Sequence, residues 1–143
     1  MIRAERFQLH HIIGFVPRDG YENLENDMRG NLADPTRDLV SIFRDDTVIA
    51  IVGLNRLRVG VGEVWLICSK FVNEIPYAFF RFIDQLINIF VMELMGLHRV
   101  QMAVDCRLPK NVKWAKTLGF QYEGLMKRYD LEGNDHYLYA KVR

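Results

Sequence analysis

Two carboxylates lie at the ends of expected strands, where a side chain can exchange a proton with a bound molecule. Glu63 opens an apolar stretch that predicts a strand over Glu63–Val72, and Asp105 follows a strand predicted over Arg99–Val104. Either carboxylate could serve as a general base, directly or through a water molecule. Each also has a structural interpretation, Glu63 as a solvated strand end and Asp105 as the cap of a turn before Pro109.

Thiol and imidazole groups give weaker signals. Cys68 lies in an apolar run, where cysteine is usually a small core residue, and no histidine has a spacing that suggests a dyad with Cys106. The adjacent residues His10 and His11 would face opposite sides of a regular element, and no Cys/His cluster has the spacing of a metal site. We therefore expect two free thiols, a reducing compartment and no bound metal.

Length and charge limit the class of protein. The chain has 143 residues, of which 50% are hydrophobic, so it can bury the core of one domain over residues 1–143. The formal net charge of +1 gives no electrostatic reason to expect nucleic acid or an anionic membrane as a partner. The charged N-terminus lacks the apolar core of a signal peptide. These features favour a cytoplasmic protein.

The N-terminal half predicts one strand, two helices and a hairpin. Met1–Phe7 can form a strand, Gln8–Val16 a short helix and Asp19–Gly30 a second helix. Two apolar runs, Leu39–Phe43 and Thr47–Leu54, flank a turn signal of two aspartates and therefore predict a β-hairpin.

The C-terminal half begins with a long apolar helix. Pro76 suits its first turn and Gly96 its end, and only a narrow polar stripe interrupts its apolar surface. Such a helix packs on a sheet, and a second copy of the chain could cover it in a homodimer. A helix over Asn111–Leu118 follows, and the strands Phe120–Leu131 and His136–Val142 would pair as a hairpin. The complete order is β-α-α-β-β-β-α-β-α-β-β, which implies an α/β fold with a mixed sheet.

Two segments resemble the GNAT superfamily of N-acetyltransferases. "LMGLHRVQMAV", Leu94 to Val104, is similar to the family's helix end and fifth strand. The segment Asn111–Val142 resembles its short helix, Leu-Gly-Phe turn and final hairpin, and "LGFQYEG", Leu118 to Gly124, is the most diagnostic part. The resemblance covers about Asp38 to the end and implies the acyl-CoA N-acyltransferase fold.

The resemblance implies an acetyl-CoA site and no metal. In the family, the fourth and fifth strands diverge and the pantetheine arm inserts between them, while the following loop and helix N-terminus bind the pyrophosphate. In this chain that loop is Asn73–Ala78, and backbone N–H groups around Ser69 to Phe71 would stabilise the oxyanion. The cofactor-binding residues implied are Ser69, Lys70, Phe71, Tyr77, Ala78, Phe79 and Lys113, the last toward the 3′-phosphate.

The sequence departs from the family at several motif positions. The glycine-rich loop positions fall near Ile75, Ala78 and Phe80, and only Ala78 is small. Ala115 stands where many members have a tyrosine that protonates the thiolate, and Leu108 stands where they have an asparagine. Phage-encoded GNAT-like proteins resemble this chain in lacking the glycine loop, so the resemblance extends to a bacteriophage origin, in the host cytoplasm or the virion.

The function implied is acetyl-CoA-dependent N-acetylation. A primary amine, on a small molecule or a protein, would attack acetyl-CoA directly in a ternary complex, with Glu63 at the mouth of the cleft as the first candidate base and Asp105 as the second. The alternative is a catalytically inactive GNAT-fold phage protein that acts as a host-interaction or virion component. The residues Ile75, Pro76, Phe80 and Ala115 at the motif positions favour that alternative.

Overall fold

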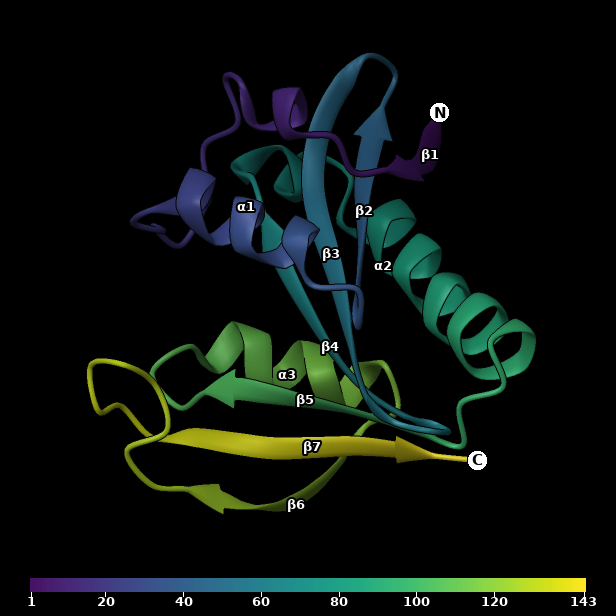
Figure 1. Cartoon of the computed structure of the whole chain (residues 1–143), viewed down its shortest axis with the longest axis vertical. Coiled ribbons are helices and arrows are strands. Elements are labelled where there is room, and N and C mark those ends of the chain that lie inside the picture. The colour runs from purple at the N-terminus through teal and green to yellow at the C-terminus, as the bar shows by residue number, and fades with distance from the viewer. The chain divides into compact units, whose positions relative to one another are not determined.

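Seven strands and the helices between them form the structure, and the computed structural model describes residues 1–143 (Figure 1). The strands are β1 (Ile2–Arg6), β2 (Arg37–Arg44), β3 (Thr47–Arg58), β4 (Val61–Cys68), β5 (Arg99–Asp105), β6 (Gln121–Met126) and β7 (His136–Val142). The helices are the 3-10 turns η1 (Leu9–Ile12) and η2 (Lys70–Glu74), the α-helices α1 (Leu24–Ala33), α2 (Pro76–Gln85) and α3 (Pro109–Thr117), and the π-helix η3 (Leu86–Leu94).

The strands are hydrogen-bonded in the order β1-β2-β3-β4-β5-β7-β6, with one parallel pair, β4 and β5. This confirms the predicted α/β fold, its mixed sheet and its order of elements. Contacts along the chain define two compact units, the first formed by Met1–Arg56 with Val64–Leu86 and the second by Leu57–Glu63 with Ile87–Arg143. The single domain expected from the sequence stays a prediction.

The first unit is built on the antiparallel strands β1, β2 and β3, with α1 over one face. Its core joins Met28 of α1 to Leu39 and Ile51 of the sheet. Successive residues of a strand point to opposite faces, and both neighbours of Ile51, Ala50 and Val52, are also buried. Strand β3 is therefore covered on both sides, as its unbroken apolar sequence indicates.

A buried histidine fixes the turn η1 to the sheet of the first unit. The side chain of His11 is 8% exposed, and its Nδ1 lies 2.8 Å from Ser41 Oγ of β2. The Gln8 N–H donates to the same nitrogen at 3.1 Å. Nδ1 therefore acts as an acceptor, and neutral His11 carries its proton on Nε2.

The stability of the fold should depend on the charge of His11. Burial, with the nearby His10, lowers the pKa of His11 below its ordinary value of 6.5, and Glu5 opposes this only in part. Below pH 6.5 the unfolded chain takes up a proton that the folded chain resists. The free energy of unfolding should therefore decrease as the pH is lowered below 6.5. Urea denaturation across this range should show the loss in the wild-type protein and in His10→Gln. In His11→Gln the stability should be lower overall but should no longer fall over this range, and an unchanged slope would contradict the assignment.

The second unit centres on β5. The first residues of β5, Arg99–Gln101, run parallel to Val61–Glu63, the start of β4. Strand β5 also pairs antiparallel with β7, and β7 with β6. Helix α3 contacts both β5 and β6 and buries Ala115. Asp105, expected just after the strand, is its last residue.

The long apolar helix changes its geometry halfway. The sequence predicts one helix from Pro76 to Gly96, but the α-helix ends at Gln85 and continues as the wider η3. The Met95 N–H donates to the carbonyl of Phe90, five residues back, at 3.0 Å, which is the bond of a π-helix. The end at Gly96 is as predicted, because its φ of 73° suits glycine. None of the helices is long and apolar enough to cross a membrane.

Several predicted boundaries differ from the structure. The strand expected over Glu63–Val72 begins at Val61 and ends at Cys68, because Lys70–Glu74 form the turn η2. The helix expected over Gln8–Val16 is only the turn η1, and Gly14 with a φ of 76° interrupts it. The second helix begins later than predicted, at Leu24, because Asn23 adopts a left-handed conformation with a φ of 59°. Strand β6 ends at Met126 instead of Leu131, and Arg128 just after it adopts a left-handed conformation with a φ of 52°.

Candidate active site

The segment after β4 is fixed by hydrogen bonds to neighbouring parts of the first unit. The Ser69 N–H donates to the carbonyl of Ile49 at 2.9 Å, and Ser69 bridges to Pro17. Its hydroxyl accepts the Phe71 N–H at 3.2 Å. This corrects the expectation that the N–H groups of Ser69 and Phe71 stabilise an oxyanion, because both already have acceptors within the protein. The side chains of Lys70 and Phe71 are exposed.

The N-terminus of α2 presents unused donors. Ile75 stands at the N-cap position without a side-chain cap, and Pro76 occupies the first turn. The first intrahelical bond runs from the Phe79 N–H to the Ile75 carbonyl at 2.9 Å. The N–H groups of Tyr77 and Ala78 precede it and therefore belong to the orphan donors of a helix start. Both residues are exposed, and no acidic side chain lies in the first turn.

Phe79 belongs to the core and not to the surface of this helix start. Its side chain is 2% exposed, and its N–H is committed to the helix. The expected cofactor contact at Phe79 is therefore corrected, because neither group is available to a ligand without unfolding the turn. Tyr77, whose side chain is 73% exposed, and Ala78 remain at the end where the helix dipole favours an anion.

Glu63 lies in the parallel part of the second unit. It pairs in register with Gln101, whose Nε2 donates to Glu63 Oε1 at 3.4 Å. The charge of Glu63 also reaches Tyr129, since burial first and this carboxylate second raise the pKa of the phenol. The carboxylate is therefore half-buried beside a neutral amide and a phenol, without a cation bound to it.

Asp105 is committed to an ion pair. Its carboxylate accepts the Arg107 backbone N–H at 2.9 Å, Nε at 3.1 Å and Nη2 at 2.8 Å. These bonds from Arg107 lower the pKa of Asp105 below its ordinary value of 3.8, against the opposite effect of burial. A carboxylate stabilised in its charged form is a poor acceptor for a proton, so the geometry favours the turn-cap interpretation of Asp105.

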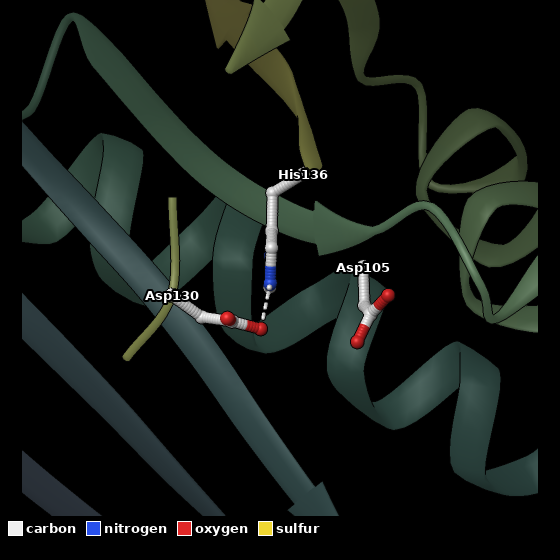
Figure 2. A group of neighbouring side chains, drawn as sticks. All are labelled: Asp105, Asp130 and His136. Atoms are coloured by element: carbon white, nitrogen blue, oxygen red, sulfur yellow. Dashed lines mark hydrogen bonds and ion pairs between the residues drawn. The ribbon is translucent and has the colours of Figure 1, made fainter. Parts of the chain in front are cut away.

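Asp105 also lies in a group with Asp130 and His136, which Figure 2 shows. One ligand atom from each lies within 4.8 Å of the others. His136 Nε2 is 3.2 Å from Asp130 Oδ2, and its Nδ1 is buried without a hydrogen-bond partner. Carboxylate and imidazole groups can hold a cation. Here, however, a cation would have to compete with Arg107, which already binds both oxygens of Asp105.

Asp130 organises the loop between β6 and β7. It accepts the backbone N–H groups of Glu132 and Asn134 at 3.0 and 2.8 Å, and these bonds with that of His136 lower its pKa to about 2. The hairpin predicted from Phe120–Leu131 and His136–Val142 gave no role to Asp130. The signal was present as an aspartate four residues before an asparagine in a polar segment, a pattern of side-chain to backbone turns.

The last helix carries the remaining expected positions. Lys113 is exposed on α3. Ala115 is 1% exposed, so the position that is a tyrosine in many family members belongs to the packed core here. Leu108 is the N-cap of α3 and offers no side-chain hydrogen bond.

Comparison with known proteins relates this architecture to acetyltransferases. No protein-family model matches the chain, and no curated protein sequence matches it. Among solved structures, a chimera of spermidine N-acetyltransferase SpeG from Vibrio cholerae and hSSAT has a TM-score of 0.77 and 14% identity, over 99% of this chain and 95% of that chain. A point mutant of Vibrio cholerae SpeG gives 0.75 and 14%, over 99% and 93%.

A third structure, described as an acetyltransferase by inference, has a TM-score of 0.77 and 18% identity, over 99% of this chain and 82% of that chain. At these identities the likeness is one of fold. The order of elements, the strand order and these three structures agree, and the chain has the GNAT, or acyl-CoA N-acyltransferase, fold.

Proposed function

We propose that the chain is an acetyl-CoA-dependent N-acetyltransferase that acts on a primary amine. The observation that carries this proposal is the exposed, uncapped N-terminus of α2, which follows β4 in a fold shared with spermidine N-acetyltransferases. The amine, on a small molecule or a protein, would attack directly in a ternary complex. Cys68 is not an activated nucleophile, since burial raises its pKa to about 12.

The residues at α2 fit the anionic part of acetyl-CoA. The N–H groups of Tyr77 and Ala78 would donate to phosphate oxygens, and the small side chain of Ala78 leaves room for them. Lys70 is exposed in the preceding turn and adds a positive charge. When bound, the cosubstrate supplies the thioester that is cleaved.

Proton transfer is assigned to Glu63. A protonated amine must lose a proton before it can attack, and Glu63 is a carboxylate with no cation bound to it. Asp105 remains the second candidate, although Arg107 binds both of its oxygens. The new C–N bond forms as the C–S bond breaks, one proton passes to the base, and the thiolate takes the other.

Thermal melting with acetyl-CoA tests the proposal. A ligand at one hundred times its dissociation constant should stabilise the fold by about 2.7 kcal/mol. In Ala78→Glu this ligand-induced shift should disappear, because a carboxylate in the first turn repels the phosphates. The same substitution suits the dipole of α2, so the free protein should melt no lower than the wild type. Ala33→Glu, at an exposed position of α1, should keep the ligand-induced shift.

The alternative is an inactive member of the fold that serves as a phage host-interaction or virion component. The buried Ala115 and the apolar Ile75 favour it, because they replace a proton donor and a polar loop residue of the family. Absence of any shift in melting temperature at millimolar acetyl-CoA would support this alternative and contradict the transferase.

A further inference from the structure

A chain of side-chain hydrogen bonds crosses the second unit and ends at Glu63. Arg99 and Gln101 are two residues apart on β5 and therefore face the same side of the sheet, and Glu63 lies beside Gln101 in register on β4. The Nε of Arg99 donates to Gln101 Oε1 at 3.0 Å, and Gln101 Nε2 donates to Glu63 Oε1 at 3.4 Å. The candidate base thus receives a hydrogen bond from a side chain that is itself held in place.

The two partners of Gln101 fix the orientation of its amide. The amide oxygen accepts from a guanidinium, which offers only donors, and the amide nitrogen faces a carboxylate, which offers only acceptors when it is ionised. A flipped amide would place donor against donor at Arg99 and oxygen against oxygen at Glu63. Gln101 therefore presents its N–H donors to Glu63.

The positive charge of Arg99 is directed away from Glu63. Its Nη1 and Nη2 donate to the two carboxylate oxygens of Glu123 at 3.0 and 2.6 Å. These bonds raise the pKa of Arg99 and lower the pKa of Glu123 below its ordinary value of 4.5, so both groups are charged at neutral pH. A further titratable group beside Glu63 is the phenol of Tyr129, which is neutral there because burial, and then the carboxylate, raise its pKa. The neutral amide of Gln101 thus stands between the ion pair and the candidate base.

Asp105 shows the effect of a guanidinium that reaches a carboxylate directly. Arg107 binds both oxygens of Asp105 and lowers its pKa, whereas Glu63 receives a hydrogen bond from an uncharged donor. A neutral donor restricts the soft terminal torsion of a glutamate without cancelling its charge. The bond uses Oε1 of Glu63, so Oε2 is left for a ligand.

We propose that Gln101 is a positioning residue for acetyl transfer, which holds Oε1 of Glu63 with a neutral donor and separates this carboxylate from Arg99, so that Oε2 takes the proton of the acceptor. In this step one N–H bond of the ammonium breaks and one O–H bond forms at Oε2, and the neutral amine then attacks the thioester. The inference rests on the proposed function and concerns the residue that prepares its base.

Gln101→Met tests the inference, because methionine keeps the length of the side chain and removes both hydrogen bonds. In assays of CoA thiol release, kcat should fall about tenfold while the KM of the amine stays within about threefold of the wild type. The acidic limb of kcat against pH should move to higher pH, since the charged form of the base loses a donor. Gln121→Met is the matched control. Gln121 is exposed on β6 and lies opposite Ala140 of β7, as Gln101 does from the other side, so the control should behave as the wild type.

Gln101→Lys distinguishes a positioning role from a merely structural one. Its ammonium would reach Glu63 as Arg107 reaches Asp105, so the acidic limb should move to lower pH and kcat should fall further than in Gln101→Met. Opposite shifts of the two limbs support the inference. Shifts in the same direction, or a kcat and limb of Gln101→Met that equal those of Gln121→Met, would overturn it. Melting with acetyl-CoA shows that each variant is folded and binds the cosubstrate.

The failure of this inference can be told from the failure of the proposed function. The wild type and Glu63→Gln establish whether the chain transfers an acetyl group and needs this carboxylate. If it does, and Gln101→Met keeps the kcat and the pH limb of the wild type, the transferase stands and Gln101 only belongs to the sheet surface. If the wild type transfers no acetyl group, the proposed function fails and the inference fails with it.

Discussion

Gly53→Ala should lower the free energy of unfolding by about 2–3 kcal/mol, because a methyl group at this position would overlap the indole ring of Trp65. Gly53 lies in the middle of β3, buried and paired with Leu39 of β2. The ring cannot move away cheaply. It packs against the core of the first unit, and its Nε1 donates to Asn55 Oδ1 at 3.3 Å. Urea denaturation measures the change.

Gly124→Ala is the matched control for this prediction. Gly124 also lies in a strand, β6, but an added methyl group there meets no atom within 4 Å. The stability of the Gly124→Ala variant should therefore equal or slightly exceed that of the wild type, since alanine reduces the entropy of the unfolded chain. Combining Gly53→Ala with Trp65→Leu should recover part of the loss. Equal effects of the two glycine substitutions would show that the indole does not cover Gly53.

Local sequence signals were sufficient for the order of elements. The pair Asp45–Asp46 between two apolar runs predicted a hairpin, and β2 and β3 pair around it, with Asp45 at a φ of 54°. Pro76 correctly marked the first turn of α2. Such signals succeed because turn geometry and apolar periodicity are properties of neighbouring residues.

The inner geometry of the site could not be predicted in this way. Whether the Ser69 N–H is available depends on Ile49 and Pro17, which are distant in sequence. A pattern of neighbouring residues in the sequence does not predict a hydrogen-bond partner that is distant in the chain. Phe79 illustrates the same limit, because the face of α2 that is buried is decided by the elements packed on it. The pair of Asp105 and Arg107, by contrast, is two residues apart and could have been anticipated as a turn with its own ion pair.

Glu63→Gln should lower the kcat of acetyl transfer by about 100-fold or more, which is the usual effect of removing a general base. Glutamine has the shape of glutamate and can keep the contact with Gln101, so the fold should be preserved while the proton acceptor is lost. The rate is measured by the release of the CoA thiol with a primary amine as acceptor. Melting temperature with acetyl-CoA serves as the control for binding and should match the wild type.

Asp105→Asn decides between the two carboxylates. Because Arg107 binds both oxygens of Asp105, this carboxylate is already neutralised, and its loss should reduce kcat much less than Glu63→Gln. The variant should instead lower stability, since Arg107 loses a charged partner at the end of β5. A larger fall in kcat for Asp105→Asn than for Glu63→Gln would reverse the assignment of the base. Equal and small effects would exclude both carboxylates and require proton transfer to solvent or to the substrate itself.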